Sequence, residues 1–111
     1  MSDVILVQKA ISTTNETKIY TNKTSTTIHS IDFTNANGHK IKVSLWLVPK
    51  NKKCEKCTMF RCKEYTVNEN DFKTLEFGDR GFTIDQIDCS VYVQCNHENA
   101  LNVTINGCKG E

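Results

Sequence analysis

The sequence has little proline, little glycine and almost no excess of charge of either sign. It contains one proline (Pro49), five glycines and one tryptophan among 111 residues. Lysine and arginine number 14 against 13 for aspartate and glutamate, which gives a formal net charge of +1. A nucleic-acid-binding domain carries a strongly basic surface, so no nucleic-acid partner is expected. The length, without repeats or a low-complexity linker, predicts one domain spanning residues 1–111.

Long hydrophobic runs are also absent. No stretch approaches the ~20 apolar residues that a membrane-spanning helix needs, so no membrane association is expected. The first residues lack the basic start and apolar stretch of a signal peptide, which favours synthesis in the cytoplasm. Three Asn-x-Thr sequons, at Asn15, Asn22 and Asn102, would matter only in a protein secreted by a eukaryote.

Helical spacing of apolar residues is rare, and strict alternation takes its place. The clearest example is the run 41–49, where one face would carry Ile41, Val43, Leu45 and Leu47. Lys42, Ser44 and Trp46 would share the opposite face. Because successive side chains of a strand point to opposite sides, this run predicts a strand with one buried face.

The same pattern recurs along the chain. Strands are expected at 4–8, 18–21, 27–33, 41–48, 65–67, 73–77, 89–95 and 101–105. The apolar phase slips between Ile28 and Ile31, which predicts a β-bulge. Asn37-Gly38 is a strong tight-turn signal and predicts a hairpin joining 27–33 to 41–48. The fold class is therefore all-β: a single-domain antiparallel β-sandwich, jelly-roll or Ig-like, with about seven or eight short strands.

A cysteine-rich loop is expected at 50–64, where charge is dense and alternation stops. Cys54, Cys57 and Cys62 have a spacing that can place thiolates on one metal ion. His97 is the candidate fourth ligand, with Cys95 and Cys108 as alternatives. The loop could therefore hold structural Zn²⁺, form disulfides within or between chains, or carry inert thiols.

Cys89 and Cys95 call for a separate interpretation. Six residues apart on one extended strand, they would lie ~20 Å from each other. This distance is too great for a mutual disulfide. We expect both to serve as small apolar core residues.

Two aromatic residues are candidates for a subunit contact. Trp46 falls on the outer face of its predicted strand, and aromatic residues are enriched at interfaces, so Trp46 with Tyr92 could form a contact between copies. Alternatively, the loop containing Cys54 and Cys62 covers Trp46. The three histidines lie near no recognisable nucleophile motif, and no enzymatic activity is expected.

The order of strand and turn signals carries a resemblance. The stretches concerned are 19–21, 28–31, 35–38, 43–49, 74–76, 81–84 and 101–107. Together they resemble the small β-sandwich virion proteins of tailed bacteriophages. The resemblance implies a capsid decoration, neck or tail accessory protein that forms homo-oligomers and binds other virion proteins. The chain departs from the pattern in its cysteine-rich loop and at Asn22-Lys23, where a turn of the Pro-Gly type is usual.

Three functional classes follow. The first is a non-enzymatic structural protein of a phage virion, made in the host cytoplasm and located in the particle. The second is a zinc-binding interaction module, based on Cys54, Cys57 and Cys62. The third is a secreted sandwich that binds carbohydrate or a receptor, based on the sequons and the even number of cysteines.

Overall fold

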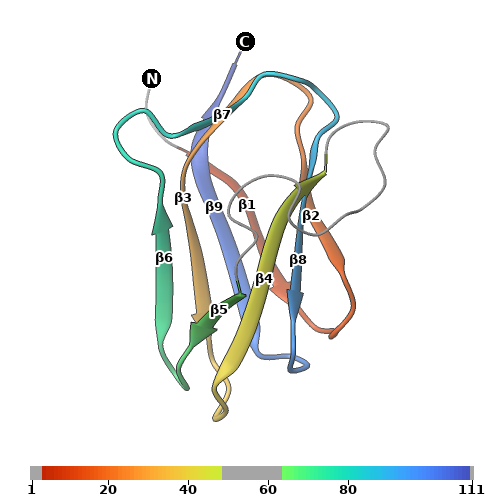
Figure 1. The fold of residues 1–111 in the computed structure, drawn as a ribbon, viewed down its shortest axis with the longest axis vertical. Helices are drawn as coiled ribbons and strands as arrows, with labels where there is room; N and C mark the ends of the chain where they lie inside the picture. The colour runs from red at the N-terminus through yellow and green to blue at the C-terminus, as the bar shows by residue number, and fades with distance from the viewer. Residues whose placement is uncertain (1–3, 49–63, 111) are drawn as a thin grey trace.

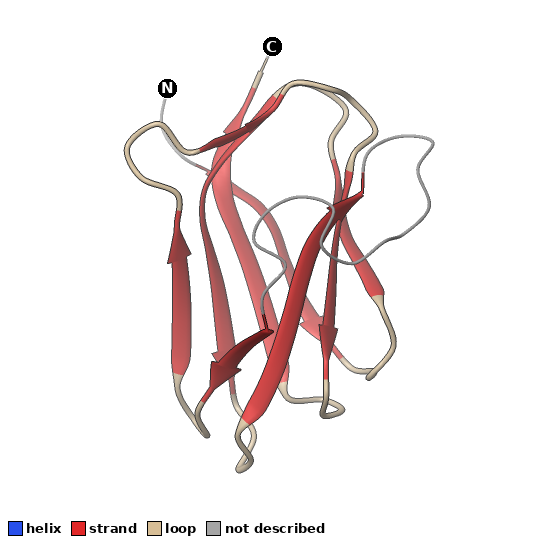
Figure 2. Ribbon diagram, viewed as in Figure 1, coloured by secondary structure: helices blue, strands red, loops and turns tan. Residues whose placement is uncertain are grey.

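The computed structural model describes residues 4–48 and 64–110, which form two β-sheets packed face to face (Figure 1). The described residues contain strands, turns and loops but no helix (Figure 2). The strands are β1 (Val4–Ile11), β2 (Thr17–Thr21), β3 (Thr26–Asn35), β4 (Ile41–Val48), β5 (Glu64–Val67), β6 (Phe72–Glu76), β7 (Phe82–Ile84), β8 (Ser90–Cys95) and β9 (Leu101–Lys109). This part of the chain therefore offers no helix long and apolar enough to cross a membrane.

All strand pairs are antiparallel. The first sheet has the order β1-β9-β3-β6, with β7 also paired to β3. The second sheet has the order β2-β8-β4-β5. The predicted all-β sandwich is confirmed, and β7 is the short strand that the sequence pattern did not separate from its neighbours.

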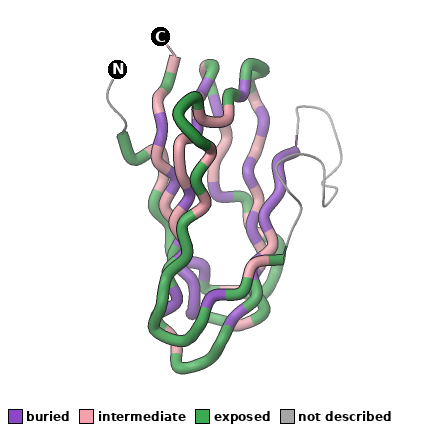
Figure 3. The backbone as a smooth tube through the Cα atoms, turned by 60° about the vertical axis from the view of Figure 1, so that its left-hand side comes forward, coloured by how far each residue is buried: buried purple, intermediate pink, exposed green. Residues whose placement is uncertain are grey.

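The core lies between the sheets and follows the alternation in the sequence. Ile41, Val43, Leu45 and Leu47 of β4 are all 0% exposed and belong to the core. The facing strands contribute their own alternate residues, among them Phe33 of β3. Figure 3 shows buried residues interspersed with more exposed ones along the strands. Burial of one face per strand therefore accounts for most of the hydrophobic stabilisation.

The predicted β-bulge is confirmed. The register between β3 and β9 shifts between Ile28 and Ser30, where the apolar phase slips in the sequence. Gly107 lies opposite Ile28 at this point, and a Cβ atom there would collide with the carbonyl oxygen of Thr27. The close approach of the two backbones thus requires glycine.

The predicted hairpin between β3 and β4 is wrong. The two strands lie in different sheets, and residues 36–40 cross from one sheet to the other. Gly38 is absent from the described residues with positive φ, which are Asn70, Gly78, Gly81, Asp88 and Asn99. The tight-turn conformation that Asn-Gly favours is therefore not adopted.

Asn35 provides the physical reason for this difference. It is 1% exposed, and its Nδ2 donates to the carbonyl oxygens of His39 (2.7 Å), Val67 (3.2 Å) and Asn68 (3.0 Å). Its Oδ1 accepts from the backbone N–H of Asn37 (2.9 Å). The side chain thereby ties the crossover to the turn between β5 and β6. A buried polar group satisfied in this way stabilises one specific chain path.

Asn22 plays a similar part at the other end of the sandwich. It is 0% exposed, its Nδ2 donates to the carbonyl oxygens of Thr24 (3.1 Å) and Gln86 (2.7 Å), and its Oδ1 accepts from the N–H of Cys89 (2.8 Å). Its amide is therefore inaccessible to glycosylation in the folded protein. Of the three sequons, only Asn15 and Asn102 are exposed.

Candidate functional site

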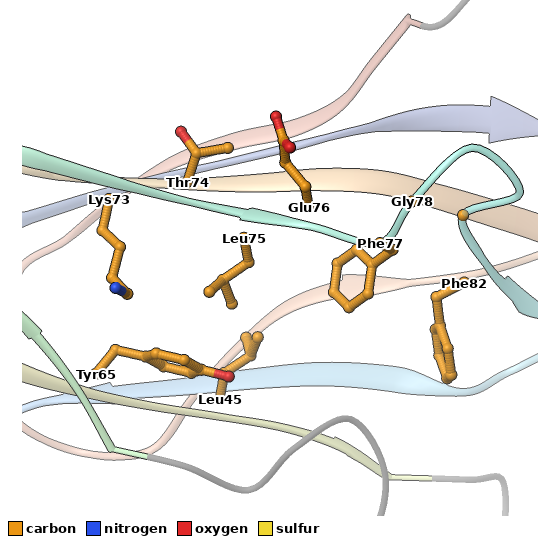
Figure 4. Close-up of a pocket in the computed structure, with 10 residues that line it drawn as sticks. Leu45, Tyr65, Lys73, Thr74, Leu75, Glu76, Phe77, Gly78 and Phe82 are labelled. Atoms are coloured by element: carbon orange, nitrogen blue, oxygen red, sulfur yellow. The ribbon is translucent and has the colours of Figure 1, made fainter.

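A groove with a mixed apolar and polar lining opens at one side of the sandwich, where the edges of the two sheets meet. It has a volume of about 610 Å³, and its lining includes Leu45, Tyr65, Lys73, Leu75, Phe77 and Phe82. These residues come from β4, β5, β6 and the start of β7, and Phe77 directly follows β6 (Figure 4). The volume lies within the range of ~300–1,000 Å³ typical of ligand pockets.

One wall of the groove is formed by residues of β4 and β5. The described pairing of these two strands runs from Ile41 to Ser44 of β4. Leu45 is the next residue of β4 and lines the groove, although it is 0% exposed. The groove therefore includes the residue of β4 that directly follows the last described pair with β5.

The other wall is the inner face of β6. Lys73 lies opposite Phe33 and Leu75 opposite Ile31 in the antiparallel pairing with β3. Phe33 and Ile31 are both 0% exposed, and directly opposed residues share a face, so Lys73 and Leu75 face the core side of the sheet. In Figure 4, both side chains extend toward β4 and β5, whereas Thr74 and Glu76 point the opposite way.

Aromatic contacts support both ends of the groove. The rings of Phe33 and Tyr65 lie 6.0 Å apart at 32°, and those of Phe77 and Phe82 lie 6.0 Å apart at 39°. These are separations at which aromatic rings attract each other. The groove thus has aromatic walls and two charged lining residues, Lys73 and Glu76, of which only Lys73 extends toward β4 and β5. This composition suits binding of an apolar segment that carries a negative charge.

The predicted metal ligands lie mostly outside the described residues. Cys54, Cys57 and Cys62, with residues 50–63 of the predicted loop, lie outside the described residues, whereas Glu64, predicted as the last residue of the loop, begins β5. His97 stacks on His39, with ring centroids 5.0 Å apart and planes at 1°. No group of three or more His, Cys, Asp or Glu residues within 4–48 and 64–110 is arranged to hold a metal ion. Zinc binding stays a prediction.

The stacked histidines are a feature that the sequence did not reveal. His39 lies in the crossover after β3, and His97 lies in the turn after β8. Residues 58 positions apart meet because β4 and β8 are neighbours, with Val43 opposite Cys95. Only the register of these strands, which is not visible in the sequence, could have indicated this pairing.

Trp46 and Tyr92, the candidates for a subunit contact, lie in directly opposed positions of β4 and β8. Their rings stack with centroids 5.9 Å apart and planes at 12°. Trp46 is 0% exposed although it does not belong to the core between the sheets. The alternative that the cysteine-rich loop covers it concerns residues outside the described part. A subunit contact stays a prediction, and it would involve the half-buried Tyr92 directly.

The core role predicted for Cys89 and Cys95 is confirmed. They are 3% and 1% exposed, belong to the core and carry free thiols. Burial raises the pKa of the Cys95 thiol, while hydrogen bonds from the backbone at His97 and Asn96 act in the opposite direction. The neutral thiol is therefore favoured, and Cys95 is poorly suited to be a thiolate ligand or nucleophile.

The comparisons with known proteins leave the function open. No protein-family model matches the chain, and no curated protein matches it. Among solved structures, the chain is similar to one described as Anabaena sensory rhodopsin transducer, at 16% sequence identity. The alignment covers 90% of this chain and 94% of the other, with a TM-score of 0.46. We base no argument on a likeness of this size.

Proposed function

We propose that this chain is a non-enzymatic structural subunit that attaches to a larger assembly, as the virion proteins of tailed phages that it resembles do. The observation that carries the proposal is the groove at the sheet edge, where apolar and aromatic side chains line a cavity beside the edge strand β6. An edge strand with adjacent side-chain pockets is the arrangement that proteins use to bind an added strand.

Exposed apolar side chains on the same sheet support this role. Phe72 at the start of β6 is 67% exposed, and Ile5 on β1 at the opposite edge is 60% exposed. Single exposed apolar residues are common, but both of these lie on edge strands, where strand addition would cover them. The partners that we propose are other virion proteins and further copies of this chain, and Tyr92 offers a separate surface for the latter.

Mass spectrometry of purified phage particles tests the virion role. The particles are those released by the host that carries the gene, with host ribosomal proteins as the measure of contamination. We expect the chain at a fixed ratio to the major capsid protein through successive density gradients. Loss of the chain during purification, in step with the contaminants, would refute a virion location.

Light scattering after size exclusion tests the homo-oligomer. We expect a mass that is a multiple of 12.6 kDa for the purified protein. A mass of one chain at every concentration would show that the subunit does not self-associate. Metal analysis of the same sample tests the separate prediction of zinc at Cys54, Cys57 and Cys62.

A further inference from the structure

Both edge strands of the first sheet carry a lysine on their inner face. Lys73 on β6 lies opposite Phe33, and Lys9 on β1 lies opposite Val103. Phe33 and Val103 are fully buried, so both lysines stand on the core side of the sheet, although both are exposed at its edges. Their long stems can lie along apolar neighbours while the ammonium groups reach water.

An inward-facing charge on an edge strand hinders strand addition. A strand added to β6 would cover Lys73 and take its ammonium group out of water. Burying a charge without a partner is strongly unfavourable. Natural β-proteins use such residues to prevent edges from pairing indiscriminately.

Lys73 differs from a purely protective charge because it lines the groove. Figure 4 shows its side chain extending toward the ring of Tyr65, on the same side of β6 as Leu75. Among the described residues, no acidic side chain forms an ion pair with Lys73. Glu76, the acid among the lining residues, points the opposite way from Lys73, and Glu64 on β5 is 3.6 Å from Lys42. A carboxylate brought by a partner would therefore meet an available cation at the groove.

We propose that the groove binds an extended peptide segment of a partner protein, added as a strand to β6, with a carboxylate side chain opposite Lys73. Side chains at alternate positions of the segment enter the groove against Leu75 and Tyr65, and the backbone pairs with the outer edge of β6. The partner is the neighbouring protein of the assembly in the proposed function, on which this inference rests.

The charge makes the groove selective. An apolar strand without a carboxylate would gain the same burial but leave the Lys73 ammonium unpaired. A strand with a lysine at that position would add repulsion. Discrimination of this kind comes from the unfavourable interaction with wrong partners as much as from the favourable one with the right partner.

Two synthetic peptides test the proposal against the full chain. Both alternate valine with threonine, and they differ only in a central glutamate or lysine on the valine side. Binding is measured by fluorescence anisotropy of a dye on the peptide. We expect the glutamate peptide to bind at least about tenfold more tightly than the lysine peptide, as close charge pairs at interfaces produce. High salt should reduce this ratio.

Charge reversal supplies the decisive comparison. Lys73→Glu should reverse the preference, so that the lysine peptide binds more tightly. Lys9→Glu on the opposite edge is the matched control, since it makes the same change at another exposed, inward-facing lysine, and it should leave both affinities unchanged. Both variants change exposed side chains, so both should remain folded.

Three results would overturn the proposal: equal affinity of wild type for the two peptides, binding of neither, or an unchanged preference in Lys73→Glu. These failures are separate from failure of the proposed function. A chain that is present in particles but does not discriminate between the peptides would refute only the groove. A chain that discriminates but is absent from particles would refute the virion role.

Discussion

Replacement of Asn35 by alanine tests how the crossover between the sheets is held. The alanine variant loses four side-chain hydrogen bonds, which now join Asn35 to His39, Val67, Asn68 and Asn37. A hydrogen bond contributes ~1 kcal/mol net, and a buried group left without a partner costs ~1–3 kcal/mol. Since His39 and Asn68 are exposed, water can reach their carbonyl oxygens, whereas Val67 is buried. The expected loss of unfolding free energy is therefore about 3 kcal/mol.

Urea denaturation followed by fluorescence of the single tryptophan measures this loss. With an m-value of about 2 kcal/mol/M, the midpoint should fall by about 1.5 M. Asn102→Ala is the control, because Asn102 is exposed on β9, and it should change stability by no more than about 0.5 kcal/mol. A loss below about 1 kcal/mol in the Asn35 variant would refute the reasoning.

Asn35→Asp separates hydrogen bonding from packing. The aspartate keeps the shape of the side chain but turns an oxygen toward the three carbonyl groups that now accept from Nδ2. Repulsion should raise the folded-state pKa of this carboxyl above its unfolded value of about 4. The unfolding free energy of this variant should therefore be highest below pH ~4, the unfolded pKa. It should fall as pH rises from there toward the raised folded-state pKa. A variant as stable as wild type at neutral pH would contradict this account.

Three further predictions concern other parts of the fold. Gly107→Ala should lower the unfolding free energy by about 3 kcal/mol or more, because the added Cβ would collide with the backbone of Thr27. Gly38→Ala is the control and should be nearly neutral, because no atom lies within 4 Å of the added Cβ. Because the pKa of Cys95 is raised in the folded state, the unfolding free energy should decline above pH ~8.5, where the thiol of the unfolded chain ionises. Urea titrations at several pH values measure this decline, and Cys95→Ala should remove the contribution of this thiol to it. Trp46, at 0% exposure, should resist acrylamide quenching in the native protein and lose this protection in urea.

The sequence was sufficient where one strand's own pattern decides the outcome. Alternation along 41–48 predicted β4, and the slipped phase between Ile28 and Ile31 predicted the bulge. Both are local consequences of which side chains must be buried. The hairpin predicted from Asn37-Gly38 was wrong because a turn signal is local, whereas the sheet that β4 joins depends on contacts between distant segments. The bonds that Asn35 makes across 32 and 33 residues override the turn preference.

The groove could not be predicted because it depends on strand order. The alternation of Lys73, Leu75 and Phe77 is visible in the sequence, but it reads as an ordinary half-buried strand. That β6 lies at the edge of its sheet and that its inner face lies opposite β4 and β5 are consequences of pairing between distant segments. The inward direction of Lys73 places this side chain at the groove only because the strands are arranged in this way.

The selectivity proposed for the groove also predicts that the charge of Lys73 limits association at the edge strand β6. In the free protein, Lys73 is exposed and its ammonium group can be solvated by water. A strand without a carboxylate would remove this water and offer the ammonium group no negatively charged partner in exchange. Lys73→Met keeps the length and the apolar stem but removes the charge. We therefore expect this variant to bind the glutamate and lysine peptides with similar affinity, and to self-associate at concentrations where wild type has a constant mass by light scattering. A methionine variant that kept both the selectivity and the constant mass would show that shape, and not the charge of Lys73, controls access to the groove.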